Sequence, residues 1–152
     1  MRKEIIYLIM TVIGGLILLG TTVYTCIMWQ KVPDQVPIHY DFAGNVTDYG
    51  GKGSMIFMLG IAWVMFIIMT VLVKFPNTWN MPVKVTAENA ERLYSITRGI
   101  LEAVKLITVI LMAFLAISSI IMTDFTDIII MILAGALLLV IAISIFMMIK
   151  NK

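Results

Sequence analysis

The sequence predicts an all-α integral membrane protein, a bundle of four transmembrane helices that forms a single domain over residues 1–152. Hydrophobic residues make up 61% of the chain and charged residues 13%, against about 45–50% and about 25% in soluble domains. The mean hydropathy is +1.04, and the apolar residues are gathered into four long runs. A soluble domain of 152 residues could not bury so much apolar surface.

The four expected spans cover residues 5–29, 55–73, 100–122 and 128–149. Each has about the 20 apolar residues that are needed to cross a hydrocarbon layer of ~30 Å. The first span follows Arg2 and Lys3, as a signal peptide would, but it is longer than a signal-peptide core and no small-residue cleavage site follows it. We therefore expect an uncleaved helix, with connecting loops over residues 30–54 and 74–99.

Basic residues in the connections predict the orientation. The connection between the second and third spans holds four of them, Lys74, Lys84, Arg92 and Arg98, whereas the connection between the first two spans has only Lys31 and Lys52. By the positive-inside rule, loop 74–99 and both termini face the cytoplasm, and loop 30–54 is the outer loop. We expect a multi-pass protein of the cell membrane whose main surroundings are the lipid bilayer.

The segment before the third span predicts an amphipathic helix that runs on into the membrane. Thr86 is a candidate helix cap, and apolar residues recur at three- to four-residue spacing from Ala90 onward. The charged side offers two pairs at i,i+4 spacing, Glu88–Arg92 and Arg98–Glu102. Two interpretations stay open: a solvated helix start, or a docking surface for a cytoplasmic partner through Glu88, Arg92 and Arg98.

The spans themselves offer little chemistry. Ionisable residues inside a membrane mark ion and proton pathways, and Glu102 and Lys105 are expected near the cytoplasmic end of the third span, where they reach the interface. A pump or coupled transporter is therefore disfavoured. Thr11 and Gly15 predict close helix packing, and the thirteen methionines are interpreted as gap fillers. The net charge is only +2 and the basic residues are dispersed, so a nucleic-acid partner has no support.

The outer loop is the long polar island of the chain and holds its only histidine, His39. Pro33 and Pro37 keep this segment out of the helical conformation. Gly44-Asn45 and Tyr49-Gly50-Gly51 are turn signals. We expect a short, structured loop that lies against the outer membrane interface.

Four roles for His39 stay open. With Asp41, it could fix the turns of the loop by hydrogen bonding. It could bind a divalent cation, although one histidine makes a poor zinc site and Asp34, Asp41 and Asp48 match no calcium loop. It could act as a general acid or base with Asp41 or Asp48, although no nucleophile motif accompanies it. It could also recognise an external ligand. We expect no cofactor and no resident metal.

The outer loop resembles that of the SdpI-type bacterial membrane proteins, and in particular the small uncharacterised domain that forms their N-terminal part. Pro37, His39 and Gly44 fit the PxHxxxxG motif of that loop, and Asp48 and Lys52 continue the resemblance. Residues 74–76 and 88–92 are also similar, so the likeness covers roughly residues 5–120. The loop motif is fairly specific, whereas the apolar helices add little.

The resemblance implies a bacterial cell-envelope protein that is not an enzyme. The family's named member is an immunity protein that protects a bacterium from its own membrane-active peptide toxin and holds a cytoplasmic repressor at the membrane. We expect this chain to be a short form, without that protein's additional C-terminal helical part. The implied toxin-recognition residues are Pro37, His39, Tyr40, Asp41, Gly44, Asp48 and Lys52.

Two alternative functions stay open beside immunity, and so does a homo-oligomeric state. The first alternative is a membrane sensor or scaffold that binds a cytoplasmic regulator, such as a repressor, on the Glu88–Arg98 face. The second is an outer-leaflet enzyme that uses His39 with Asp41 or Asp48. A homo-oligomer is compatible with each of these functions.

Overall fold

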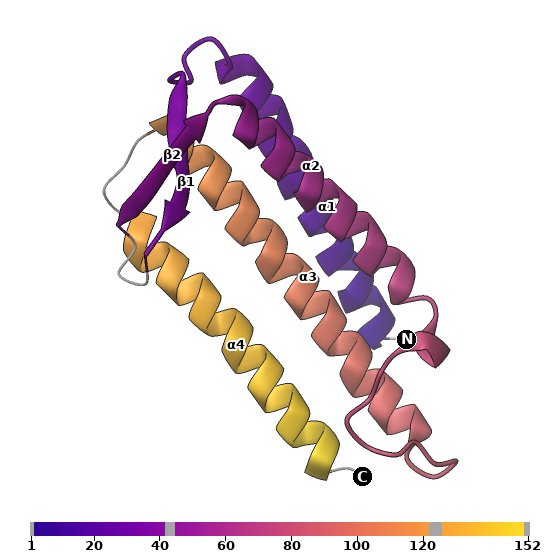
Figure 1. Cartoon of the computed structure of the whole chain (residues 1–152). Coiled ribbons are helices and arrows are strands. Elements are labelled where there is room, and N and C mark those ends of the chain that lie inside the picture. The colour runs from indigo at the N-terminus through magenta and orange to yellow at the C-terminus, as the bar shows by residue number, and fades with distance from the viewer. Residues whose placement is uncertain (1, 42–44, 122–125, 151–152) are drawn as a thin grey trace.

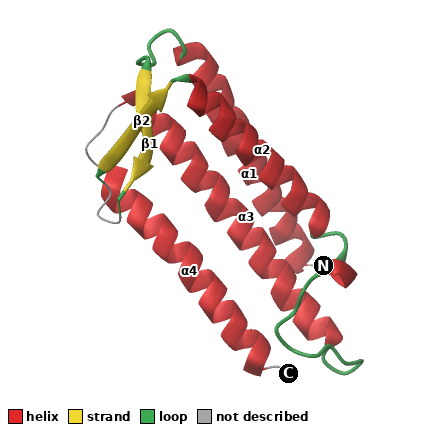
Figure 2. Cartoon of the chain, viewed as in Figure 1, coloured by secondary structure: helices red, strands yellow, loops and turns green. Residues whose placement is uncertain are grey.

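The computed structural model describes residues 2–41, 45–121 and 126–150. Within these residues the chain forms four long helices and a two-stranded antiparallel hairpin (Figures 1 and 2). The helices are α1 (Arg2–Met28), α2 (Gly53–Leu72), α3 (Ala90–Ile121) and α4 (Thr126–Lys150), and a short 3-10 helix, η1 (Pro76–Thr78), follows α2. All four long helices are long and apolar enough to cross a membrane, so the predicted four-helix fold is confirmed.

Helix α3 is the central element of the bundle. It packs against each of the other three long helices, and α4 lies mainly against α3 (Figure 1). The core between α1, α2 and α3 is built from Leu18, Leu59, Ala62, Val109 and Ala116. Large apolar side chains cover the outside of the bundle, as for Leu138 of α4, which is 68% exposed. Such an apolar exterior is suited to lipid and not to water.

The two ends of the bundle differ. The end of α1, the hairpin and the start of α2 lie together at one end, here called the hairpin end (Figure 1). The start of α1, η1 and the end of α4 lie toward the other, here called the termini end. That the termini end is cytoplasmic remains a prediction from the distribution of basic residues.

The predicted outer loop contains a β-hairpin that was not expected, formed by β1 (Gln35–Tyr40) and β2 (Val46–Gly51). Gln35 pairs with Gly51 and His39 with Asp48, with irregular register on both sides of His39. The prediction that Tyr49-Gly50-Gly51 forms a turn was wrong, because these residues lie within β2. The bare Cα of Gly50 makes room for the Ile38 side chain on the facing strand: a Cβ at Gly50 would lie 2.8 Å from Ile38 Cγ2.

The hairpin is anchored to the bundle by an apolar cluster. Val32, Val36 and Met55 are buried together, and Trp29 and Ile120 pack against them. Trp29 and Val32 precede β1 and Val36 lies within it, whereas Met55 and Ile120 belong to the facing ends of α2 and α3. The cluster fixes the base of the hairpin against the helices, as expected for a structured loop.

Helix α3 begins at Ala90, before the predicted start of the third span, and its 32 residues give a length of about 48 Å. This exceeds the ~30 Å hydrocarbon layer, and its first turns project past the end of α2 (Figure 1). Thr86 Oγ1 accepts a hydrogen bond from the Asn89 amide, and Asn89 Oδ1 accepts one from the Thr86 amide, as in a capping box. The expected cap and extension are therefore present. The predicted end of the third span, residue 122, lies outside the described residues.

Candidate functional site

His39 lies on β1 directly opposite Asp48 of β2. Its Nδ1 is 3.9 Å from Asp48 Oδ2, and the two side chains are 72% and 63% exposed. The other carboxylate oxygen of Asp48 accepts a hydrogen bond from the Tyr49 amide at 2.9 Å. An exposed contact of this length contributes little to stability. The structure therefore leaves His39 available at the surface of the hairpin.

Asp41, which follows β1, bonds to Asn45, which precedes β2. Its two carboxylate oxygens accept hydrogen bonds from the backbone amide and the side-chain amide of Asn45, at 2.8 and 2.9 Å. The Asp41 amide also donates to the Asn45 carbonyl at 2.9 Å. These bonds support the turn-forming role that was one of the open interpretations. Gly44 lies outside the described residues, as does the side chain of Tyr40.

Lys52 closes the base of the hairpin. Its amide donates to the Asp34 carbonyl, and its Nζ lies 3.0 Å from Asp34 Oδ1. The same ammonium group lies 5.8 Å from the centre of the Trp29 ring, within the range of a cation–π contact. Lys52 therefore joins the end of β2 to the segment before β1, and its contacts are structural.

A groove of about 470 Å³ lies between the hairpin and the helices. Its lining is mostly apolar and comes from β1, α2 and α3: Pro37, Ile38, His39, Ser54, Met55, Phe57, Met58, Ile61, Met112, Leu115 and Ser119. Methionine side chains adapt to irregular ligands. His39 and Ser54 add polar groups to this lining, so the groove suits a ligand with one polar and one apolar side. Pro37 and His39 are thus brought to one groove, whereas Asp41 and Lys52 serve the hairpin.

Among the residues that the structure describes, no three histidine, cysteine or acidic side chains lie close enough together to hold a metal ion. The carboxylate that the strand register places opposite His39 is that of Asp48, and not that of Asp41.

A second polar site, absent from the sequence-based prediction, lies inside the bundle. Lys105 Nζ is 2.8 Å from Glu102 Oε2 on the next turn of α3, and both residues are buried, at 1% and 3% exposure. Thr11 of α1 donates to Glu102 at 3.0 Å and accepts from Lys105 at 2.8 Å. Lys105 also donates to Thr70 of α2 at 3.3 Å and lies 5.5 Å from the ring centre of Phe66.

Glu102 and Lys105 were expected near one end of the third span with side chains that reach the interface, but both side chains are buried between the helices. Lys105 lies level with Thr70, two residues before the end of α2 at Leu72. The side chains turn inward because Thr11 and Thr70, on the two facing helices, supply the hydrogen bonds that a buried charge requires. These two threonines, each alone in an apolar segment, were the signal that could have revealed the site.

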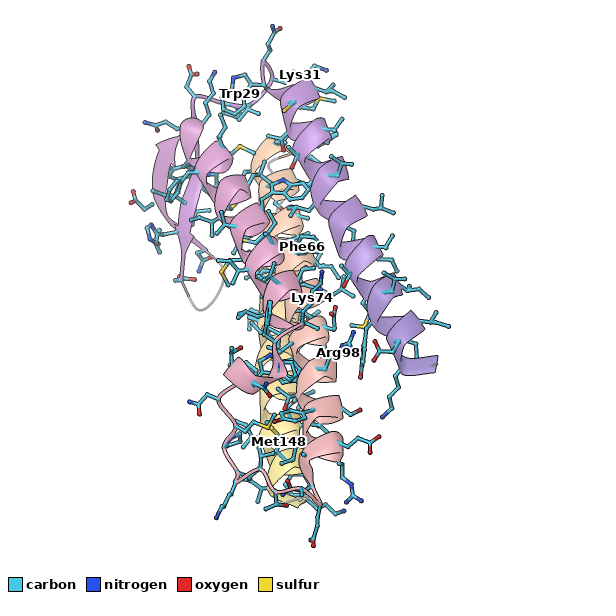
Figure 3. All side chains as sticks on the ribbon, turned by 90° about the vertical axis from the view of Figure 1, so that its right-hand side faces the viewer. Trp29, Lys31, Phe66, Lys74, Arg98 and Met148 are labelled. Atoms are coloured by element: carbon cyan, nitrogen blue, oxygen red, sulfur yellow. The ribbon has the colours of Figure 1, made fainter. Side chains whose placement is uncertain are left out.

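The prediction that Arg98 pairs with Glu102 was also wrong, since each residue has another partner. Arg98 Nη1 lies 2.8 Å from Glu4 Oε1, and its guanidinium carbon lies 5.1 Å from the ring centre of Tyr7. In Figure 3, Arg98 of α3 lies toward the termini end, and Phe66 of α2 lies farther from that end.

Further polar contacts between α1 and α3 extend from the Glu102–Lys105 pair toward the termini end. Lys3 Nζ donates to Ser95 Oγ at 3.0 Å, and Tyr7 Oη donates to the Ser95 carbonyl at 3.3 Å. We call the whole series along the α1–α3 interface the polar ladder: Lys3, Glu4, Tyr7 and Thr11 of α1 with Ser95, Arg98, Glu102 and Lys105 of α3. The ladder ends at Lys105, where Phe66 and the apolar core cluster follow.

The three residues of the predicted partner surface are divided between two places. Glu88 and Arg92 are exposed and line a groove of about 800 Å³ together with Lys84 and Lys150. Arg98 lies apart from this groove, because it pairs with Glu4 at the start of α1. Of the three predicted residues, Glu88 and Arg92 therefore belong to this exposed charged surface and Arg98 does not.

One comparison with known proteins gives a match. A protein-family model, described as a domain of unknown function (DUF1648), matches residues 16–63. This region contains the second half of α1, the hairpin and the first part of α2. No curated protein and no solved structure matches the chain. The matched region includes the hairpin and the α2 side of its groove, whereas Glu102 and Lys105 lie outside it.

Proposed function

We propose that this chain is a non-enzymatic bacterial membrane protein that protects its cell against a membrane-active peptide toxin, recognising the peptide in the groove beneath the hairpin. The match to the uncharacterised domain supports a role for the hairpin region, since that match covers the hairpin with the second half of α1 and the first part of α2. The resemblance of the Pro37–Lys52 segment to SdpI-type proteins supports immunity as that role.

The groove between β1, α2 and α3 is the observation that carries this proposal. Phe57, Met58, Ile61 and Leu115 are among its apolar lining residues from α2 and α3, and His39 and Ser54 contribute polar groups. Its volume of about 470 Å³ is within the ~300–1,000 Å³ of ordinary ligand sites. A membrane-active peptide is amphipathic, so its apolar side chains fit the helix-lined part and its polar groups fit the hairpin side.

The position of the groove also favours a ligand that arrives through the bilayer. Phe57 is 73% exposed and Ile61 42% exposed, although both belong to a membrane-spanning helix. A peptide dissolved in the membrane therefore reaches them laterally, without entering the bundle. The hairpin adds two short strands whose outer edges can pair with an extended peptide.

Survival of a sensitive bacterium that carries this chain tests the proposal. The cells are challenged with a panel of membrane-active peptides at matched membrane levels of the wild-type chain, His39→Ala and Lys31→Ala. Lys31 is an exposed residue at the same end of the bundle that does not line the groove. The proposal requires protection by the wild-type chain that His39→Ala reduces and Lys31→Ala retains. A wild-type chain that protects against none of the peptides would contradict it.

A sensor or scaffold that binds a cytoplasmic regulator is the second candidate. The surface groove around Glu88 and Arg92 favours it, because Lys84 and Lys150 add further exposed charge there. In this case, Arg92→Glu should abolish capture of a regulator at the membrane, whereas His39→Ala should have no effect. Recruitment of a labelled regulator to membranes that contain each variant separates the two candidates.

A further inference from the structure

A cavity of about 790 Å³ lies at the termini end, between the start of α1, the end of α2, η1 and α3. Three aromatic residues line it, Tyr7, Trp79 and Tyr94. Trp79 is held in place by a 2.8 Å hydrogen bond from its Nε1 to the Leu72 carbonyl and by an edge-on contact with Tyr94. Tyrosine and tryptophan settle at the level of lipid headgroups, so this cavity lies at the membrane interface.

The charged residues around the cavity favour an anion. Lys3, Lys74 and Arg98 line it together with Glu4 and Glu91, which leaves one net positive charge. Glu4 is already engaged by Arg98 at 2.8 Å. The Arg98 side chain, which is 33% exposed, contributes its positive charge to the lining.

A second, apolar groove of about 350 Å³ begins at the same place. It shares Lys3, Tyr7 and Ser95 with the cavity and runs between α1, α3 and α4. The rest of its lining is small or aliphatic apart from one serine: Ile96, Gly99, Ile100, Ala103, Val140, Ile143, Ser144 and Met147. An anion site that adjoins an apolar groove within the membrane matches a lipid, whereas free phosphate would use only the first of these features.

We propose that this cavity binds the phosphodiester of an anionic phospholipid, with an acyl chain in the adjoining apolar groove. The single negative charge of a phosphodiester matches the one net positive charge of the lining. Lys3, Lys74 and Arg98 attract the headgroup. The bound lipid then bridges α1, α2 and α3 at the termini end.

Native mass spectrometry of the purified full-length chain tests this site, with phosphatidylglycerol and phosphatidylcholine of the same acyl chains added in competition. The wild-type chain is expected to retain phosphatidylglycerol preferentially. Lys3→Gln and Lys74→Gln should each lower that preference about fivefold, the usual effect of one basic residue near an anionic lipid. Lys31→Gln is the matched control, because Lys31 is an exposed lysine at the opposite end (Figure 3).

Three results would overturn the proposal. The first is equal retention of the two lipids by the wild-type chain, and the second is a loss in Lys31→Gln as large as that in Lys74→Gln. The third is displacement of the lipid by millimolar inorganic phosphate, which would make the cavity a site for free phosphate. Lys74 is exposed and lies outside the polar ladder, so Lys74→Gln should fold normally, and its helix content by circular dichroism provides the check.

Discussion

Lys105 Nζ lies 2.8 Å from Glu102 Oε2, with both side chains enclosed by three helices of a membrane protein. Thr11 of α1 bonds to both members of the pair, and Thr70 of α2 bonds to the lysine. The pair thus joins α1, α2 and α3 at one level of the bundle. A buried pair of this kind adds little net stability but makes any other alignment of the helices costly.

Breaking this pair should be much more harmful than removing it. Glu102→Leu leaves a buried ammonium without its counter-ion, which should cost about 3–5 kcal/mol of the free energy of unfolding. Lys105→Met should cost a similar amount. The double variant should regain most of the loss, since neither charge is then left unpaired. Unfolding of the purified variants in detergent measures the three values. Additive losses in the double variant would show that the two residues act independently.

The ion pair at the termini end should contribute far less. Glu4 is 58% exposed and Arg98 33% exposed at the side chain, so water and salt screen their attraction. Glu4→Gln should therefore lower the free energy of unfolding by less than about 1 kcal/mol. The same detergent experiment compares it with Glu102→Gln, which should cost several times more. Equal losses in the two variants would contradict the buried position of Glu102.

Two neighbouring glycines in β2 should differ in their tolerance of alanine. A Cβ at Gly50 would lie 2.8 Å from Ile38 Cγ2, whereas a Cβ at Gly51 meets nothing within 4 Å. Gly50→Ala should therefore cost about 1–3 kcal/mol through overpacking. Hydrogen exchange of the hairpin amides should accelerate in Gly50→Ala and remain unchanged in Gly51→Ala. Equal exchange rates in the two variants would mean that Ile38 does not pack over Gly50.

The orientation of the hairpin can be tested with single cysteines. Cys26 is the chain's only cysteine, so Cys26→Ser provides a background without thiols. In this background, Asp34→Cys at the hairpin end and Lys84→Cys at the termini end are both expected to be exposed, because Asp34 and Lys84 are. A membrane-impermeant maleimide added to intact cells should label the first and not the second. Labelling of Lys84→Cys alone would reverse the predicted orientation.

The four spans could be predicted from the sequence because length and hydropathy determine them directly. The hairpin was missed because glycines of an outer loop usually indicate turns, and whether Gly50 lies in a strand depends on Ile38 of the facing strand. The Glu102–Lys105 pair was missed for a similar reason. The burial of the two side chains depends on their hydrogen bonds to Thr11 and Thr70 of other helices.

The groove beneath the hairpin is the centre of the functional proposal, and two adjacent residues of α2 test it most directly. Phe57 lines the groove, whereas Ile56 does not, and both are large exposed apolar residues. Cells carrying Phe57→Ala or Ile56→Ala at equal membrane levels are challenged with a peptide against which the wild-type chain protects, and their survival is measured. Peptide recognition in the groove predicts that Phe57→Ala loses protection and Ile56→Ala keeps it. Full protection by Phe57→Ala would contradict that account.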